Sequence, residues 1–210
     1  MFVRLGYNGV SFLAIGKEVG IGHSAIHYYF RTKEDLAEYV LANYCQDTLE
    51  HYRTVWKDEA LGLTDKCLAI RDWIYRRYVK YNPGGRGGKV WGLLTRFSID
   101  ADQLSPNIKI LIRETEGQIE ALVREGVEIA VRKGELRADA PVHEISIQIA
   151  TLLQLSMQLT RYAGSFQRFD DLLRWTCRVV QQSYGEPHVT SDWRPPDFLM
   201  LLGEGEKGEG

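Results

Sequence analysis

The sequence predicts an all-α protein, with a small N-terminal helical unit followed by a larger set of helices. Apolar residues recur at steps of three and four, and the clearest stripe begins Ile108, Ile112, Thr115, Ile119. No alternating pattern of useful length predicts a strand. Glycine and proline cluster at 82–88 and 134–141, and these breakers divide the pattern into separate helices.

Composition and charge restrict the kinds of nucleic-acid binding that the protein could perform. The 210 residues are 44% apolar and carry a formal net charge of -2, which argues against a globally basic nucleic-acid binder. The charge is uneven, however, because residues 1–33 carry Arg4, Lys17, Arg31 and Lys33 against Glu18 alone. This N-terminal excess of bases is compatible with a surface that faces phosphate groups.

Several chemistries have no support in the sequence. The three cysteines are widely spaced and odd in number, so neither a disulfide framework nor a zinc site is predicted. The pair His143-Glu144 lacks the continuation of a zinc-protease motif, and no phosphate-binding loop or nucleophile elbow occurs. We expect no metal, no cofactor and no catalytic residue. Without an apolar span or signal peptide, a cytoplasmic location is expected.

Two short helices are predicted near the N-terminus. The first has Ser11 as N-cap, carries Phe12, Ile15 and Val19 on one stripe, and ends at Gly20. The second runs from about residue 23 to 30 and is too short to be stable without tertiary packing. A helix, a turn that contains glycine and a second helix form a helix-turn-helix unit, whose second helix enters the DNA major groove.

A long helix follows directly. Thr32 and Asp35 have the spacing of a capping box, which predicts a helix from Lys33 to about Trp56. Behind the exposed front of the second short helix, Ile26 and either Tyr29 or Phe30 are expected to anchor it. The unit is therefore small and polar where DNA must come close, and apolar where it meets its own core.

Residues 6–36 resemble the N-terminal domain of the TetR family of transcriptional regulators. The matching positions are Gly6-Tyr7, Ser11, Ile15, Gly20, Tyr29-Phe30, Thr32-Lys33-Glu34 and Leu36. The resemblance implies that Ser11 and Lys33 contact phosphates, and that His23, Ser24, Ala25, His27 and Tyr28 face the groove or its backbone. The sequence departs from the family at His27, where Tyr is usual. It also departs before Gly6, where the first helix is short or truncated.

The remaining chain is predicted to form helices over 64–81, 89–97, 105–133, 142–162 and 169–184. This gives a DNA-binding domain at 1–45 and an effector-binding and dimerisation domain at 46–185. The segment 186–210, which ends in G-E-G-E-K-G-E-G, is low in apolar residues and is expected to be a disordered tail.

The segment 142–162 is apolar on more than one side, which indicates either a second copy of the chain or burial within its own subunit. On the first interpretation, the last two long helices form a four-helix bundle with their symmetry mates. The expected interface residues are Ile145, Ile149, Leu152, Leu159, Leu172, Trp175 and Val179.

An effector pocket is predicted within the second domain, because Thr115 and Gly126 interrupt the apolar stripe of 105–133 and leave space. The expected lining residues are Trp73, Tyr78, Trp91, Arg96, Phe97, Thr115 and Gln158. The alternative interpretation is that these rings are core. Together with the patterns, the TetR resemblance implies a homodimeric, operator-binding transcriptional regulator, a repressor released by a small-molecule effector. The alternative function is a helical small-molecule-binding protein that does not bind DNA.

Overall fold

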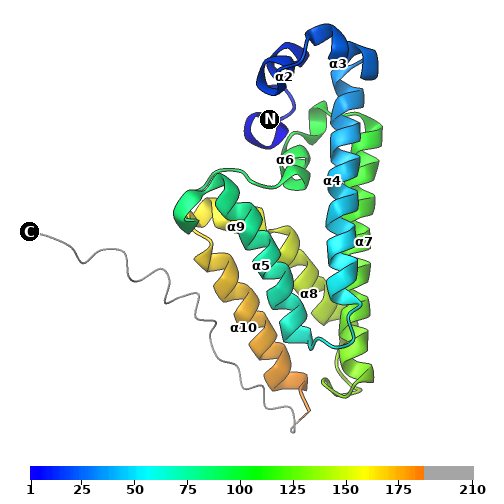
Figure 1. Ribbon diagram of the computed structural model, residues 1–210. Coiled ribbons are helices and arrows are strands. Elements are labelled where there is room, and N and C mark those ends of the chain that lie inside the picture. The colour runs from blue at the N-terminus through cyan, green and yellow to red at the C-terminus, as the bar shows by residue number, and fades with distance from the viewer. Residues whose placement is uncertain (187–210) are drawn as a thin grey trace, which may run out of the picture.

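The computed structural model describes residues 1–186, and all regular secondary structure in that range is helical (Figure 1). The prediction of an all-α fold is confirmed. The expected tail lies, from residue 187 on, outside the described residues. The α-helices are α1 (Phe2–Leu5), α2 (Phe12–Val19), α3 (His23–Tyr29), α4 (Lys33–Trp56), α5 (Leu63–Tyr81), α6 (Leu93–Ile99), α7 (Pro106–Arg132), α8 (Val142–Gln154), α9 (Ser156–Ala163) and α10 (Gln167–Tyr184).

Local capping sets the ends of the N-terminal helices as the sequence predicts. The Ser11 hydroxyl accepts a hydrogen bond from the Ala14 N–H at 3.2 Å, and Gly20 ends α2 in the left-handed conformation with φ of 72°. At the start of α4, Thr32 and Asp35 form a reciprocal capping box with bonds of 2.9 and 3.0 Å. These bonds satisfy backbone donors that the first turn of a helix leaves unpaired.

The helices α4 and α7 run side by side along the length of the molecule (Figure 1). Beside their lower halves lie α5, α8, α9 and α10 (Figure 1). These helices pack with α4 and α7 around a large hydrophobic core. Trp56, at the end of α4, is fully buried and lies against Gly126 of α7, where a Cβ atom would stand 2.3 Å from the ring. The gap expected at Gly126 is thus filled by an indole from α4.

A second, smaller core lies under α2 and α3. Its buried residues from the first 45 positions include Phe2, Ile26 and Leu41, but α6 supplies Leu93 and Phe97 to the same cluster. The beginning of α7 contributes to it as well. The N-terminal unit is therefore completed by residues of α6 and α7, from Leu93 onwards.

Two predicted helices differ from the structure. The segment 142–162 is interrupted at Leu155, so that α8 and α9 are separate helices, and the helix predicted over 89–97 begins at Leu93 instead. Residues 86–92, which precede α6, are bound to α9 and to Gly164 at its C-terminal end. The Trp91 indole N–H donates to the Thr160 hydroxyl at 2.9 Å, and the Gly87 N–H donates to the Gly164 carbonyl at 2.7 Å.

Candidate DNA-binding unit and ligand groove

The front of α3 is open to solvent and its back is anchored. Ile26 is buried against the N-terminal core, whereas the side chains of Ser24, Ala25 and His27 are exposed. Tyr28 has 84% of its surface exposed. Small residues in the first turn of α3 leave its backbone accessible to a phosphate backbone or to base edges.

Phe30, rather than Tyr29, closes the back of α3. The Phe30 ring is half-buried and lies 5.5 Å from the Tyr39 ring of α4, while Tyr29 is exposed and contacts Tyr28. On α2, Val19 is exposed as well, so the predicted stripe holds for Phe12 but not for its last member. The exposed tyrosines add two phenol groups to the surface that α3 presents.

The expected phosphate contacts, Ser11 and Lys33, lie at the ends of this unit. The Ser11 oxygen accepts the capping bond from Ala14, which leaves its O–H free to donate. The Lys33 ammonium donates to the Tyr7 carbonyl at 3.1 Å and lies 4.2 Å from the centre of the Tyr7 ring. Burial, followed by the charge of Glu34, raises the pKa of Tyr7, so its phenol stays neutral.

The N-terminal bases are not all equivalent. Arg4 forms an ion pair with Glu18 at 2.9 Å, so its charge is locally compensated. Lys17 and Arg31 are exposed, and neither forms an ion pair with any residue in the range 1–186. Those two cations remain available to attract a polyanion.

The residues predicted to line one effector pocket lie in separate places. Tyr78 and Trp91 are buried in the large core with their rings 6.3 Å apart. Phe97 belongs to the N-terminal core, where its ring meets Phe2 at 5.5 Å. Arg96 forms an ion pair with Asp100 at 3.3 Å. The structure thus does not bring Phe97 and Arg96 to the same cavity as Tyr78.

Trp73 belongs to a column of stacked side chains between α4 and α5. His51 lies parallel to the indole with the ring centres 4.9 Å apart, and the Arg77 guanidinium lies 3.8 Å from the indole and 4.5 Å from the Tyr44 ring. Burial, with a smaller effect of the Arg76 and Arg77 charges, lowers the pKa of His51. Of this stack, the sequence indicated only Trp73, because sequence spacing does not show which residues of two different helices will meet.

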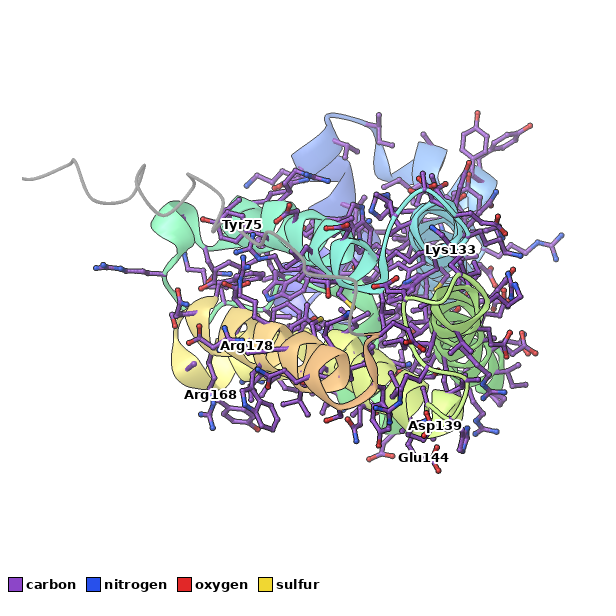
Figure 2. The ribbon with its side chains drawn as sticks, turned by 90° about the horizontal axis from the view of Figure 1, so that it is seen from below. Tyr75, Lys133, Asp139, Glu144, Arg168 and Arg178 are labelled. Atoms are coloured by element: carbon purple, nitrogen blue, oxygen red, sulfur yellow. The ribbon has the colours of Figure 1, made fainter. Side chains whose placement is uncertain are left out.

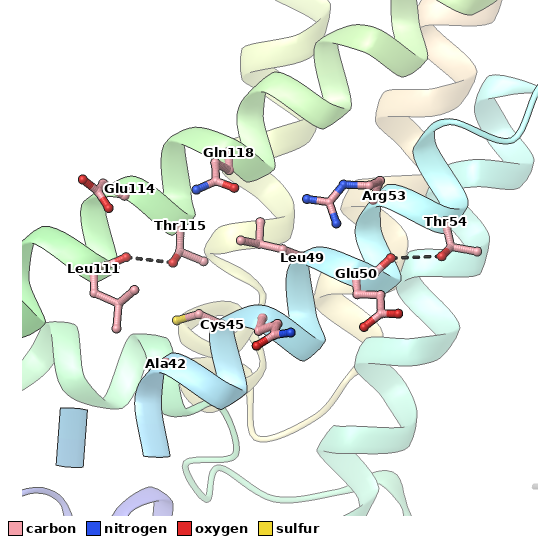
Figure 3. Close-up of a pocket in the computed structure, with 11 residues that line it drawn as sticks. Ala42, Cys45, Leu49, Glu50, Arg53, Thr54, Leu111, Glu114, Thr115 and Gln118 are labelled. Atoms are coloured by element: carbon pink, nitrogen blue, oxygen red, sulfur yellow. Dashed lines mark hydrogen bonds between the residues drawn. The ribbon is translucent and has the colours of Figure 1, made fainter. Parts of the chain in front are cut away.

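Thr115 does line a depression, a groove of about 650 Å³ along the seam between α4 and α7 (Figure 3). Its floor includes Thr115 and Cys45, both buried, and the Thr115 hydroxyl donates to the Leu111 carbonyl at 2.7 Å. Glu50 and Arg53 lie on its α4 side. Gln158 lies outside this groove, on α9, and its Oε1 atom is buried without a hydrogen-bond partner in the described chain.

The predicted interface residues divide into two sets. Ile145 and Ile149 are buried in the core of their own subunit, with 3% and 0% of their surface exposed, so they cannot face a second copy. Leu152, Leu159 and Leu172 are half-buried. Trp175 is 60% exposed, and Val179 lies one turn further along α10.

The exposed apolar face lies on α8 and α10, which pack against each other. Besides Trp175 and Val179, it includes Ile147 on α8 and Leu155 at the break after it. Charged side chains also lie on these helices, with Arg168 and Arg178 on α10 and Glu144 on α8 (Figure 2). Apolar residues among charged ones are typical of a protein interface.

The described residues offer neither a metal site nor a membrane span. Within residues 1–186, no group of three or more histidine, cysteine or acidic side chains could hold a metal ion, and no helix is long and apolar enough to cross a membrane. The three cysteines are buried as free thiols. The hydrogen bond with Cys177, together with burial, raises the pKa of Cys67 well above its usual range, which keeps that thiol protonated.

Comparison with known protein families agrees with this geometry. Residues 1–40 match the family described as bacterial regulatory proteins, tetR family. No curated protein matches the sequence.

Solved structures resemble the whole fold. The chain is similar to NemR from E. coli in its reduced form, with 15% identity over 90% of this chain and 93% of that one and a TM-score of 0.73. It is also similar to a TetR-family regulator from Agrobacterium tumefaciens, at 18% identity, 85% and 90% coverage and a TM-score of 0.71. A TetR regulator from Legionella pneumophila matches at 20% identity, 85% and 90% coverage and a TM-score of 0.68.

Proposed function

We propose that this TetR-family, DNA-binding transcriptional regulator is a homodimeric repressor that leaves its operator when a small molecule binds. The observation that carries DNA binding is the exposed front of α3, small at Ser24 and Ala25 and held from behind by Ile26. Regulators of this kind act by binding, so we assign no catalytic role to any residue. We place its action in the cytoplasm, because the operator is there.

At the operator, α3 would enter the major groove with its first turn against base edges. Ser24 and His27 can donate or accept hydrogen bonds there, and Ala25 offers a small apolar contact. Ser11 and Lys33 would contact the phosphates on either side, and phosphate contacts fix the register without reading sequence.

A binding selection tests this role for α3. Purified protein is incubated with a pool of random duplexes, and bound duplexes are recovered by mobility shift. Ala25→Glu, which places a carboxylate at the front of α3, is expected to abolish the shift. Ala121→Glu, at an exposed alanine of α7, serves as the matched control and should bind as the wild type does. Equal binding by both variants would exclude α3 as the reading helix.

Homodimerisation through α8 and α10 is supported by the exposed apolar face that includes Ile147, Leu155, Trp175 and Val179. Two copies packed through these helices would form a four-helix bundle and present two α3 helices. Their separation should match about one turn of DNA, roughly 34–36 Å. Trp175→Glu should give monomers in light scattering and weaken operator binding. Tyr162→Glu, at an exposed residue of α9, is the control, and dimers of both variants would place the interface elsewhere.

The effector site we favour is the groove between α4 and α7. It is lined by Thr115, the polar residue expected from the sequence, and α4 leads directly into the helix-turn-helix unit. A molecule wedged between α4 and α7 would change the separation of the DNA-reading helices, provided that it binds the two states with different affinity.

The effector proposal can be tested without knowing the effector. Compounds retained by the purified protein are identified by mass spectrometry and then added to the protein–operator complex. Ala42→Trp, which fills the groove from α4, should retain operator binding but lose the response to the compound. Ala121→Trp, outside the groove, should respond as the wild type does. A full response from Ala42→Trp would exclude the groove as the effector site.

A further inference from the structure

We propose that Asp100 and Lys33 are positioning residues for DNA binding, because they hold the backbone N–H and C=O of Tyr7 and so fix the helix-turn-helix unit on the body of the protein. This inference rests on the proposed function, since its main readout is affinity for DNA. We refer to Tyr7, Lys33 and Asp100 as the Tyr7 clamp.

The first half of the clamp comes from the end of α6. The Tyr7 N–H donates to Oδ2 of Asp100 at 2.9 Å, across 93 positions of sequence. The Asp100 side chain is only 17% exposed, and Arg96 forms an ion pair with the same oxygen at 3.3 Å. A hydrogen bond to a partly buried carboxylate is stronger than one between neutral groups, so Asp100 is a firm anchor for a loop residue.

Gly6 allows this close approach. Its φ is +72°, a conformation that favours glycine, and a Cβ atom there would stand 2.1 Å from an Arg96 nitrogen and 2.6 Å from the Asp100 carboxylate. The backbone at Gly6 thus lies directly against the side chains of α6. One turn away, the Phe2 and Phe97 rings pack edge to face at 5.5 Å. Polar and apolar contacts thus both join residues 2–7 to α6 and the residue that follows it.

The second half of the clamp comes from the start of α4. The Lys33 ammonium donates to the Tyr7 carbonyl at 3.1 Å and lies over the Tyr7 ring at 4.2 Å. An ammonium has three donors, so this bond leaves donors for a phosphate. Lys33 can therefore serve DNA binding in two ways, by direct contact and by holding Tyr7.

The clamp acts on α2 and α3 through a short length of chain. Tyr7 precedes Ser11, the N-cap of α2, by four residues. The residues that precede α6 are in turn bound to the body of the protein, because Trp91 bonds to Thr160 of α9 and Gly87 bonds to Gly164, which follows α9. A shift of α6 would thus move Tyr7 and the start of α2 with it.

The direction in which Asp100→Ala changes DNA affinity distinguishes a positioning role from a simple effect of charge. Asp100 carries a negative charge, and removing an acid from a DNA-binding protein relieves repulsion from the phosphates. Electrostatics alone therefore predicts that Asp100→Ala binds DNA as tightly as the wild type or more tightly. A positioning role predicts weaker DNA binding by Asp100→Ala. Without its bond to Asp100, the Tyr7 N–H no longer holds the helix-turn-helix unit in the orientation that binds DNA.

The test measures affinity for a duplex that the wild type selects from a random pool. Asp100→Ala should bind about tenfold more weakly, as expected for loss of a charged hydrogen bond. Asp100→Asn keeps an acceptor for the Tyr7 N–H and should bind within about threefold of the wild type. Asp102→Ala removes an exposed acid two residues away and should not weaken binding. Unchanged or tighter binding by Asp100→Ala, or equal losses in Asp100→Ala and Asp102→Ala, would overturn the proposal.

Amide hydrogen exchange gives a second readout that does not need DNA. Exchange at Tyr7 should accelerate in Asp100→Ala and stay slow in Asp100→Asn, while protection within α4 and α7 is unchanged. Unchanged protection of Tyr7 in Asp100→Ala would reject the clamp. If the wild type selects no duplex, the proposed function fails, and the exchange data still decide whether the clamp exists.

Discussion

The two hydrophobic cores of this protein differ in how they are built. The large core draws on α4, α5 and α7 to α10 and encloses whole side chains such as Trp56 and Tyr78. The N-terminal core contains few residues of α2 and α3, and Phe97 of α6 completes it from outside the first 45 residues. The DNA-binding unit is therefore seated on α6 and α7 rather than closed on itself.

Buried polar groups reinforce the large core at the end of α4. The buried Lys66 ammonium donates to the carbonyls of Trp56 and Asp58 at 2.7 and 2.6 Å, which caps the last turn of the helix. The Glu135 carboxylate accepts the N–H of Leu63 at 2.9 Å at the start of α5. These bonds fix the end of α4 to the body of the protein.

The largest effect is expected from removing the α6 side chain that completes the N-terminal core. Phe97→Ala deletes a fully buried ring, which should lower the free energy of unfolding of the N-terminal unit by about 3–5 kcal/mol. Hydrogen exchange should then show loss of protection in α2 and α3, with α8 and α10 still protected. Ile149→Ala, in the large core, is the matched control. Uniform loss of protection in both variants would mean that the two cores unfold as one.

A smaller effect is expected at the contact between α4 and α7. Gly126→Ala places a methyl group 2.3 Å from the Trp56 ring, and overpacking of this kind costs about 1–3 kcal/mol. Urea unfolding should show a lower midpoint for this variant. Gly117→Ala, on the same helix with open space around it, should be neutral or stabilising. An equally well tolerated Gly126→Ala would mean that Trp56 does not lie against Gly126.

The smallest expected effect is a pH dependence of the body. Burial, followed by the Arg76 and Arg77 charges, lowers the pKa of His51 below the ordinary value for histidine. Below about pH 6.5 the unfolded chain therefore binds a proton that the folded chain does not, and stability falls as the pH falls. His51→Gln should flatten this fall in urea midpoints between about pH 7.5 and 5.5, whereas His143→Gln, at an exposed residue, should not. Identical slopes in both variants would remove His51 as the cause.

Local signals explain why the N-terminal unit could be predicted. The Ser11 cap, the Gly20 turn and the Thr32–Asp35 box each act over a few residues, so spacing alone identified them. Which of Tyr29 and Phe30 is buried depends on the direction in which α3 meets α4, and the sequence left this open.

Tertiary contacts explain most of what the sequence did not show. Ile145 and Ile149 have the apolar pattern of either an interface or a core, and only the packing of α8 places them inside. Gly126 does interrupt the apolar stripe of α7, but Trp56 of α4 occupies the space that it leaves. The bond between Tyr7 and Asp100 spans 93 positions and has no local signal at all.

If a dimer presents two α3 helices that read operator DNA, the sequences of the duplexes selected by the wild type should show it. Duplexes recovered from a random pool should contain two inverted half-sites with centres about 10 base pairs, or one helical turn, apart. Half-site enrichment should disappear with Ala25→Glu, and the paired arrangement should disappear with Trp175→Glu. A selection that enriches no common sequence, or enriches the same sequence with Ala25→Glu, would contradict the claim.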